Sequence, residues 1–235
     1  MVYVISDLHG LKLERLTALL DKAGFSRSDW LYIIGDVVDR QNDGGVEMLE
    51  WLLYQPNVQL LRGNHEDMLL SCRFVLDEVT DESIAALDEM KLKLLSHYMR
   101  NGAEVTLNSL KKLKKSSPET VEAIFDYLLD APIYEYVSAG GRDFLLLHGG
   151  LRDFSPARPI SDYAPHDIVW ERPKIDDKYF ENITTVIGHT PTDEYGEEYN
   201  GKIVYTKTWI DIDVGAAYGN PPILLRLDDM KEFTE

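Results

Sequence analysis

The sequence predicts an α/β fold with a helical insertion, and three observations support this. Short apolar runs alternate with helical periodicity over the first seventy residues, helical periodicity alone fills the region from about Cys72 to Asp130, and strand-like runs return after Ile133. Alternating strands and helices are typical of right-handed βαβ units and a mainly parallel sheet. No internal repeat or low-complexity linker divides the 235 residues, so we expect a single domain over residues 1–235.

The strands are predicted from mainly apolar runs of three to five residues, which are too short for helices. In the N-terminal part they cover Val2–Ser6, Leu31–Ile34 and Val58–Leu61. In the C-terminal part they cover Ile133–Val137, Phe144–Leu147, Thr185–Ile187, Ile203–Tyr205 and Ile223–Leu227.

The helices are predicted from apolar residues that recur at helical spacing. Between the N-terminal strands these are the leucines at 13, 16, 19 and 20 and the segment Val46–Tyr54. Inside the insertion, Ser117 and Pro118 are typical of a helix start, and Val121, Ile124 and Phe125 begin the apolar face that follows.

The charge of the chain excludes several classes of partner. There are 41 acidic and 24 basic side chains, which gives a formal net charge of −17. Non-specific binding to nucleic acid or to an anionic membrane requires a basic surface, so we expect neither partner. The single cysteine, Cys72, has no intramolecular partner for a disulfide, and no apolar run approaches the ~20 residues that span a bilayer. With no basic leader before Val2–Ile5, we expect a cytoplasmic location.

Five polar motifs directly follow predicted strands. They are D-L-H-G at 7–10, G-D-V-V-D-R at 35–40, R-G-N-H-E at 62–66, H-G-G at 148–150 and G-H-T at 188–190. Each one alone has an ordinary explanation as a helix cap, a tight turn or a buried histidine. Because the carboxyl ends of parallel strands meet at one edge of a sheet, we expect the five motifs to converge. Together they offer a mixed nitrogen and oxygen donor set that suits divalent metals, and one carboxylate can bridge two ions ~3.5–4 Å apart.

In this order the five motifs resemble those of the calcineurin-like metallophosphoesterases. More narrowly, they are similar to the phosphoprotein phosphatase family, in the bacterial Ser/Thr phosphatase branch related to bacteriophage lambda phosphatase. The resemblance extends from Val2 to about Leu227 and is weak in the insertion. It implies a metallophosphoesterase-type β-sandwich flanked by helices, and a metal-dependent phosphoric ester hydrolase.

The resemblance also implies a role for each motif residue. Two divalent metal ions are expected, Mn²⁺ first, with Fe or Zn as the alternatives. The implied ligands are Asp7 and His9 for the first ion, Asp36 as the bridge, and Asn64, His148 and His189 for the second ion.

Four further residues are implied to act on the substrate. His65 would be the general acid that protonates the leaving oxygen, held in place by Asp39, and Arg40 and Arg172 would bind the substrate phosphate. The metal ions and the two arginines would supply the local positive charge that an anionic substrate needs in a chain of this acidity.

The implied activity is attack of a metal-bound hydroxide on a phosphomonoester, with a phosphorylated protein or a small phosphoester as substrate and Ser/Thr phosphoprotein phosphatase as the first reading. An alternative is hydrolysis of a dinucleoside polyphosphate such as diadenosine tetraphosphate, because enzymes of that class resemble this chain in size and in G-H-T-P-T. They usually carry Ala where this chain has Asp39. A second alternative is an inactive protein-binding scaffold, against which the intact pair of His65 and Asp39 argues.

One position distinguishes branches of the superfamily, and another departs from the commonest phosphatase pattern. Many nucleases and cyclic-nucleotide phosphodiesterases carry a histidine where this chain has Pro191, which favours the phosphatase branch. Gln41 stands where glycine usually follows the arginine, so the path of that loop is expected to differ.

The insertion leaves the sheet just after Asn64–Glu66 and returns just before the strand that leads to His148. Both flanks belong to the motif-bearing edge, so we expect the insertion to lie over or beside the cleft. It would act there as a wall or lid, or it would be a helical cap that only adds core.

Overall fold

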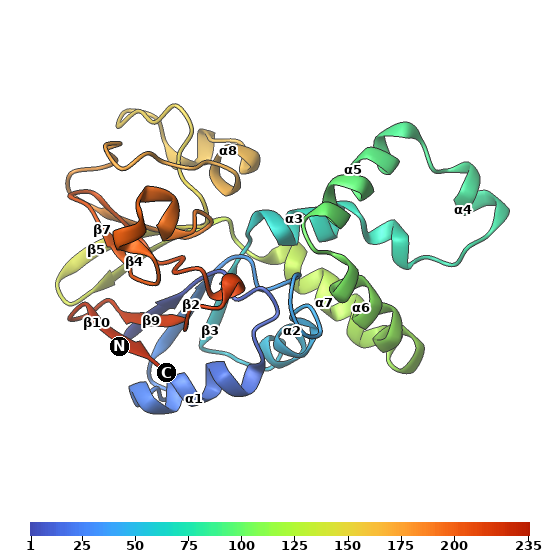
Figure 1. Cartoon of the computed structure of the whole chain (residues 1–235), viewed down its shortest axis with the longest axis horizontal. Helices are drawn as coiled ribbons and strands as arrows, with labels where there is room; N and C mark the ends of the chain where they lie inside the picture. The colour runs from blue at the N-terminus through green and yellow to red at the C-terminus, as the bar shows by residue number, and fades with distance from the viewer.

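Two five-stranded sheets face each other, and helices cover their outer faces (Figure 1). The computed structural model describes all residues from Met1 to Glu235. The first sheet has the order β10-β9-β1-β2-β3 and the second has the order β4-β5-β6-β8-β7. None of the helices is both long and apolar enough to cross a membrane.

The first sheet has a parallel centre and an antiparallel edge. Parallel pairing joins β1 (Val2–Ile5), β2 (Trp30–Ile34) and β3 (Val58–Leu61), while β9 (Ile223–Arg226) and β10 (Lys231–Thr234) run antiparallel. The parallel pairing expected from the strand and helix alternation of the first seventy residues is found in β1, β2 and β3. The antiparallel edge arises because the chain returns to β1 from the opposite direction at its C-terminal end.

The second sheet repeats this arrangement. Its parallel centre is β5 (Arg142–Leu147), β6 (Thr184–Ile187) and β8 (Trp209–Asp211), with β4 (Tyr134–Ala139) and β7 (Val204–Tyr205) antiparallel at the two edges. The sequence patterns did not predict β8 or β10.

The helices connect and cover the sheets. They are α1 (Leu13–Ala23), α2 (Val46–Leu52), α3 (Asn64–Ser71), α4 (Asp81–Ala85), α5 (Glu89–Arg100), α6 (Glu104–Ser116), α7 (Pro118–Asp130) and α8 (Pro165–Val169). Single turns of 3₁₀ helix are η1 (Arg73–Leu76), η2 (Ile160–Asp162), η3 (Thr192–Tyr195), η4 (Glu197–Tyr199) and η5 (Ala216–Tyr218).

The central strands are buried on both faces, so their side chains alternate between two cores. In β1, Tyr3 and Ile5 pack toward the helices, whereas Val4 packs between the sheets. In β5, Leu145 joins the outer core of the second sheet and Leu146 joins the core between the sheets. Three apolar layers result, and the middle one fixes one sheet on the other.

The insertion is anchored through α6, α7 and the C-terminal end of α5. Helices α6 and α7 place Leu107, Leu110, Ile124 and Phe125 in the outer core of the first sheet. Helix α5 fully buries Tyr98 and α4 buries nothing. Figure 1 accordingly shows α4 and α5 projecting away from both sheets.

Candidate metal site

Five strands from both sheets end around one cluster of polar side chains. β1 leads to Asp7 and His9, β2 to Asp36, β3 to Asn64, β5 to His148 and β6 to His189. All six side chains are buried. The structure therefore brings together every residue that the sequence predicted as a metal ligand.

The backbone of this cluster is held in an unfavourable conformation. Nine residues other than glycine have positive φ, and six of them belong to the predicted site: Asp7, His9, Asp36, Asp39, Arg40 and His189. Each such residue costs about 1–3 kcal/mol and persists only where the surrounding structure enforces it. Strain concentrated in this way is typical of a functional site.

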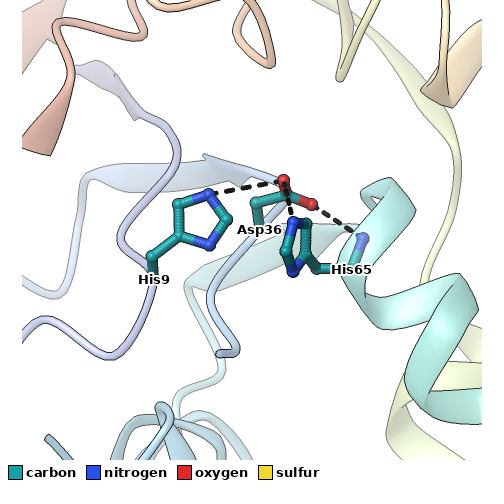
Figure 2. Close-up of side chains that lie close together, drawn as sticks. All are labelled: His9, Asp36 and His65. Carbon is teal, nitrogen blue, oxygen red and sulfur yellow. Dashed lines mark hydrogen bonds and ion pairs between the residues drawn. The ribbon is translucent and has the colours of Figure 1, made fainter. Parts of the chain in front are cut away.

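Asp36 lies at the centre of the cluster (Figure 2). Its Oδ2 is 3.6 Å from His9 Nε2 and 3.8 Å from His65 Nε2, and its Oδ1 is 3.2 Å from His148 Nε2. Burial opposes ionisation, but His148 and His65 outweigh it and hold the pKa of Asp36 well below its usual range. The bridging position predicted for Asp36 therefore holds a carboxylate with histidines on both oxygens.

Three histidines contribute ring nitrogens to the cluster. His9 Nδ1 lies 3.0 Å from the Val38 carbonyl and His148 Nδ1 lies 2.8 Å from the Ile34 carbonyl, so each ring donates outward through Nδ1–H and leaves Nε2 as the inner nitrogen. His189 Nε2 is buried without any hydrogen-bond partner. Burial lowers the pKa of His9 to about 3 and that of His189 to about 2, so both rings are neutral and able to bind a metal.

The donor atoms fit divalent metal ions. The side-chain donors of His9, Asp36 and His65 lie within 4.8 Å of one another, and so do those of Asp36, His148 and His189. Asp7 Oδ1 is 3.8 Å from His9 Nε2, which adds a second carboxylate beside the first group. Asn64 Oδ1 is 2.9 Å from His148 Nε2 in the second group. Imidazole nitrogens and carboxylate oxygens gathered in this way form a donor set in which proteins hold such ions.

His65 is distinguished from the other histidines by its partner. Its Nδ1–H donates to Asp39 Oδ2 at 2.6 Å, and both side chains are fully buried. Burial alone would lower the pKa of His65, but Asp36 and Asp39 overcome it and the pKa is raised. The other ring nitrogen, Nε2, lies 3.3 Å from the Arg40 guanidinium.

The two predicted phosphate-binding arginines lie in different surroundings. Arg40 lies 3.3 Å from His65 Nε2 and donates a hydrogen bond to the Tyr218 hydroxyl at 2.9 Å. Tyr218 is an exposed residue. Arg172 is paired with Glu194 at 2.8 Å on the surface, while its charge still contributes to the lowered pKa of His189. To reach a substrate phosphate beside Arg40, Arg172 would have to leave Glu194.

One supporting residue was not predicted. The buried Glu66 carboxylate accepts backbone N–H groups of Asp36, Val37 and Gly63 at 2.8–2.9 Å, and so joins the turns after β2 and β3. Glu66 belongs to the R-G-N-H-E motif, where an acid in the first turn of a helix has an ordinary explanation as a cap. The complete burial of Glu66, which would have indicated its supporting role, could not be read from the sequence.

Comparison with known proteins agrees with this geometry. Residues 1–214 match the family described as calcineurin-like phosphoesterase. The chain belongs to this family. The predicted family and the predicted sandwich with helices are thereby confirmed.

Curated relatives of this phosphoesterase fall into two groups. The "Bis(5'-nucleosyl)-tetraphosphatase, symmetrical" of Buchnera aphidicola is 32% identical over 97 residues, covering 38% of this chain and 35% of the relative. The protein of the same name from Neisseria gonorrhoeae is 39% identical over 71 residues, covering 29% and 25%. Rat "Serine/threonine-protein phosphatase with EF-hands 1" is 33% identical over 78 residues, covering 31% and 12%. The matched regions span about a third or less of each relative's length.

The similar solved structures are also named after these two activities, and both share the fold of this chain. A putative diadenosine tetraphosphatase superposes on all of this phosphoesterase and 92% of its own chain, with a TM-score of 0.61 and 19% identity. A Saccharomyces cerevisiae protein serine/threonine phosphatase with similarity to human PP5 superposes on all of it and on 78% of its own chain, with a TM-score of 0.58 and 15% identity. Similarity at these identities establishes the shared architecture and leaves the substrate to the site itself.

Proposed function

We propose that this phosphoesterase hydrolyses phosphomonoesters, with phosphoserine and phosphothreonine proteins as its substrates. The observation that carries the proposal is the buried pair of His65 and Asp39, with 2.6 Å between Nδ1 and Oδ2. An alkoxide leaving from serine or threonine is a strong base and needs a proton in the transition state. A nucleotide leaving from a phosphoanhydride is a weak base and gains little from an acid, so a built acid favours monoester hydrolysis.

Each residue of the site has a part in this proposal. The ligand set, Asp7 with His9, Asp36, Asn64, His148 and His189, would hold two divalent ions, with Mn²⁺ proposed first. When bound, such ions activate water and neutralise phosphoryl charge.

The remaining steps belong to side chains around the ligand set. Arg40 would bind and orient the phosphoryl oxygens, with Arg172 as the second candidate. His65 Nε2 faces Arg40 and would carry the proton to the leaving oxygen, while Asp39 keeps the ring in register.

The second candidate function is hydrolysis of dinucleoside polyphosphates. It is favoured by the activity for which the bacterial relatives and one similar solved structure are named. The metal ligands and Arg40 suit either substrate. Only the acid pair separates the two, because its advantage depends on the basicity of the leaving group.

A substrate panel in Mn²⁺ tests the proposal. Phosphopeptides, phenyl phosphate and diadenosine tetraphosphate are compared by kcat/KM in wild type and in Asp39→Ala. We expect phosphopeptides to be the best substrates and Asp39→Ala to lower their turnover far more than that of the dinucleotide. A wild-type preference for diadenosine tetraphosphate, with equal losses in Asp39→Ala, would establish the second function instead. No turnover of any member, with both metal equivalents bound, would indicate a scaffold.

A further inference from the structure

Two hydroxyl groups of the insertion bind the carboxylate behind His65. Tyr98 in α5 donates its hydroxyl to Asp39 Oδ1 at 2.8 Å, and the Thr106 hydroxyl in α6 lies 2.7 Å from the same oxygen. All three side chains have no exposed surface. Asp39 Oδ1 is thus occupied from the insertion, and Oδ2 remains for His65.

The insertion also holds the backbone of this loop. Thr106 Oγ1 accepts the N–H of Asp39 at 3.0 Å, and its own proton faces both Asp39 Oδ1 and the Gly44 carbonyl at 3.1 Å. The N–H of Arg40 donates to the carbonyl of Gly102, in the turn between α5 and α6, at 3.1 Å. The left-handed φ values of Asp39 (79°) and Arg40 (70°) are therefore supported by hydrogen bonds from outside their own loop.

The contact is too close to be a loose cover. A Cβ atom added to Gly44 would lie 2.2 Å from Thr106 Oγ1, and one added to Gly102 would lie 3.0 Å from Arg40 Cγ. Glycine is required at both places because the two segments approach to backbone contact.

Core packing alone does not explain these residues. Burying hydroxyl groups and a carboxylate costs free energy unless they bind each other, and an apolar residue would fill the same space at lower cost. Burial, together with the charge of Asp39, raises the pKa of Tyr98 well above its usual range, so Tyr98 remains a donor throughout the working pH range. The arrangement supplies fixed donors to one oxygen of an acid whose other oxygen aligns a histidine.

We propose that Tyr98 and Thr106 are positioning residues, which fix the Asp39 carboxylate and through it the His65 ring for proton donation. The insertion is then part of the active centre rather than a separate cap. This inference rests on the proposed function, in which His65 is the general acid.

Single hydroxyl deletions test the inference by their dependence on the leaving group. Tyr98→Phe and Thr106→Val should each lower kcat for phenyl phosphate about tenfold, the scale of one charge-assisted hydrogen bond. KM and metal content should not change, and kcat for 4-nitrophenyl phosphate should stay within about twofold because that leaving group needs little protonation. Thr106→Ser keeps the hydroxyl and should retain the wild-type kcat for phenyl phosphate.

The matched control is Tyr127→Phe. It removes a tyrosine hydroxyl from α7 of the same insertion, where it accepts the Leu60 N–H at 3.3 Å and does not touch Asp39. It should leave the ratio between the two substrates unchanged. An equal loss on both substrates in Tyr98→Phe, or the same ratio change in Tyr127→Phe, would overturn the inference.

Proton NMR supplies a readout that does not depend on turnover. A proton held between His65 Nδ1 and Asp39 gives a downfield resonance, which Asp39→Asn should abolish and thereby assign. Tyr98→Phe should shift or broaden this resonance in the metal-free protein, whereas an unchanged resonance would contradict the positioning role. If wild type hydrolyses no phosphomonoester, the proposed function fails, and the NMR comparison still decides whether Tyr98 aligns the pair.

Discussion

Replacing Gly35 by alanine should damage the site through a single methyl group. Gly35 follows β2 with a φ of +80°, and a Cβ there would lie 2.4 Å from His148 Nδ1 and 2.8 Å from the Cα of Gly63. The nitrogen it would displace is the one that holds the His148 ring on the Ile34 carbonyl. His148 Nε2 would therefore move away from Asp36.

The magnitude follows from two contributions. A left-handed φ costs an alanine about 1–2 kcal/mol, and overpacking against the ring and backbone adds about 1–3 kcal/mol. Gly141 is the matched control, because its φ is +75° and a Cβ there would meet nothing within 4 Å. Gly141→Ala should therefore lose only the stability that the left-handed φ costs, without the cost of overpacking.

Thermal unfolding in EDTA, followed by circular dichroism, measures the difference without interference from bound metal. For a chain of this length 1 kcal/mol corresponds to roughly 2–4 °C, so Gly35→Ala should melt about 2–12 °C below Gly141→Ala. After dialysis against Mn²⁺, elemental analysis should find both metal equivalents in Gly141→Ala and a deficit in Gly35→Ala. Equal melting temperatures and equal metal contents would refute the argument.

Four other predictions concern the ligands and the acid. Asp36→Asn should lower metal content and abolish turnover of an aryl phosphate, because Asp36 faces both groups of donors; His9→Ala should be milder in the same elemental and kinetic assays. His65→Ala should lower kcat by ~10²–10⁴ on poor leaving groups and much less on good ones, measured across a series of phosphomonoesters. Although burial opposes it, Asp36 raises the pKa of His148 to about 10 in the metal-free protein. Metal binding at pH 8 should therefore release a proton, which an indicator dye detects. The His148→Asn variant should not release this proton. The pKa of His148 in the folded protein exceeds the unfolded value near 6.5, so protonated His148 stabilises the fold below pH 6.5 and this stability is lost as pH rises to about 10. Denaturant titrations in EDTA should show this trend in wild type and not in His148→Asn.

The part of the fold carried by local signals could be predicted from the sequence. The strand Val58–Leu61 occupies the predicted residues, and the predicted apolar run at 31–34 gained only Trp30. Strands without a strong apolar run were missed. β10, with the sequence K-E-F-T, buries one side chain and is defined by its pairing with β9, which no local pattern reveals.

The candidate site was predictable where its residues follow strands. Asp36 and His148 lie at strand ends on opposite sheets, and the motif order was enough to place them together. Tyr98 was not predictable, since its spacing in α5 is that of a core residue and its partner Asp39 lies 59 positions away. The ion pair of Arg172 with Glu194 depends equally on long-range contacts that spacing does not encode.

The ligand set is divided between the two sheets, and this has a consequence for substitutions far from the site. Asp36 stands on the first sheet and His148 on the second, and the distance between them is set by the apolar layer in which Ile34 and Leu146 pack. A cavity in that layer lets one sheet settle on the other and misaligns the halves of the site, whereas a cavity beneath the outer helices leaves their alignment intact. The apolar layer between the sheets thus sets the spacing of the two halves of the ligand set. Truncating Leu146 should therefore lower metal content and activity, as the loss of a metal ligand would, whereas an equal truncation of Leu16 should only lower the stability of the protein.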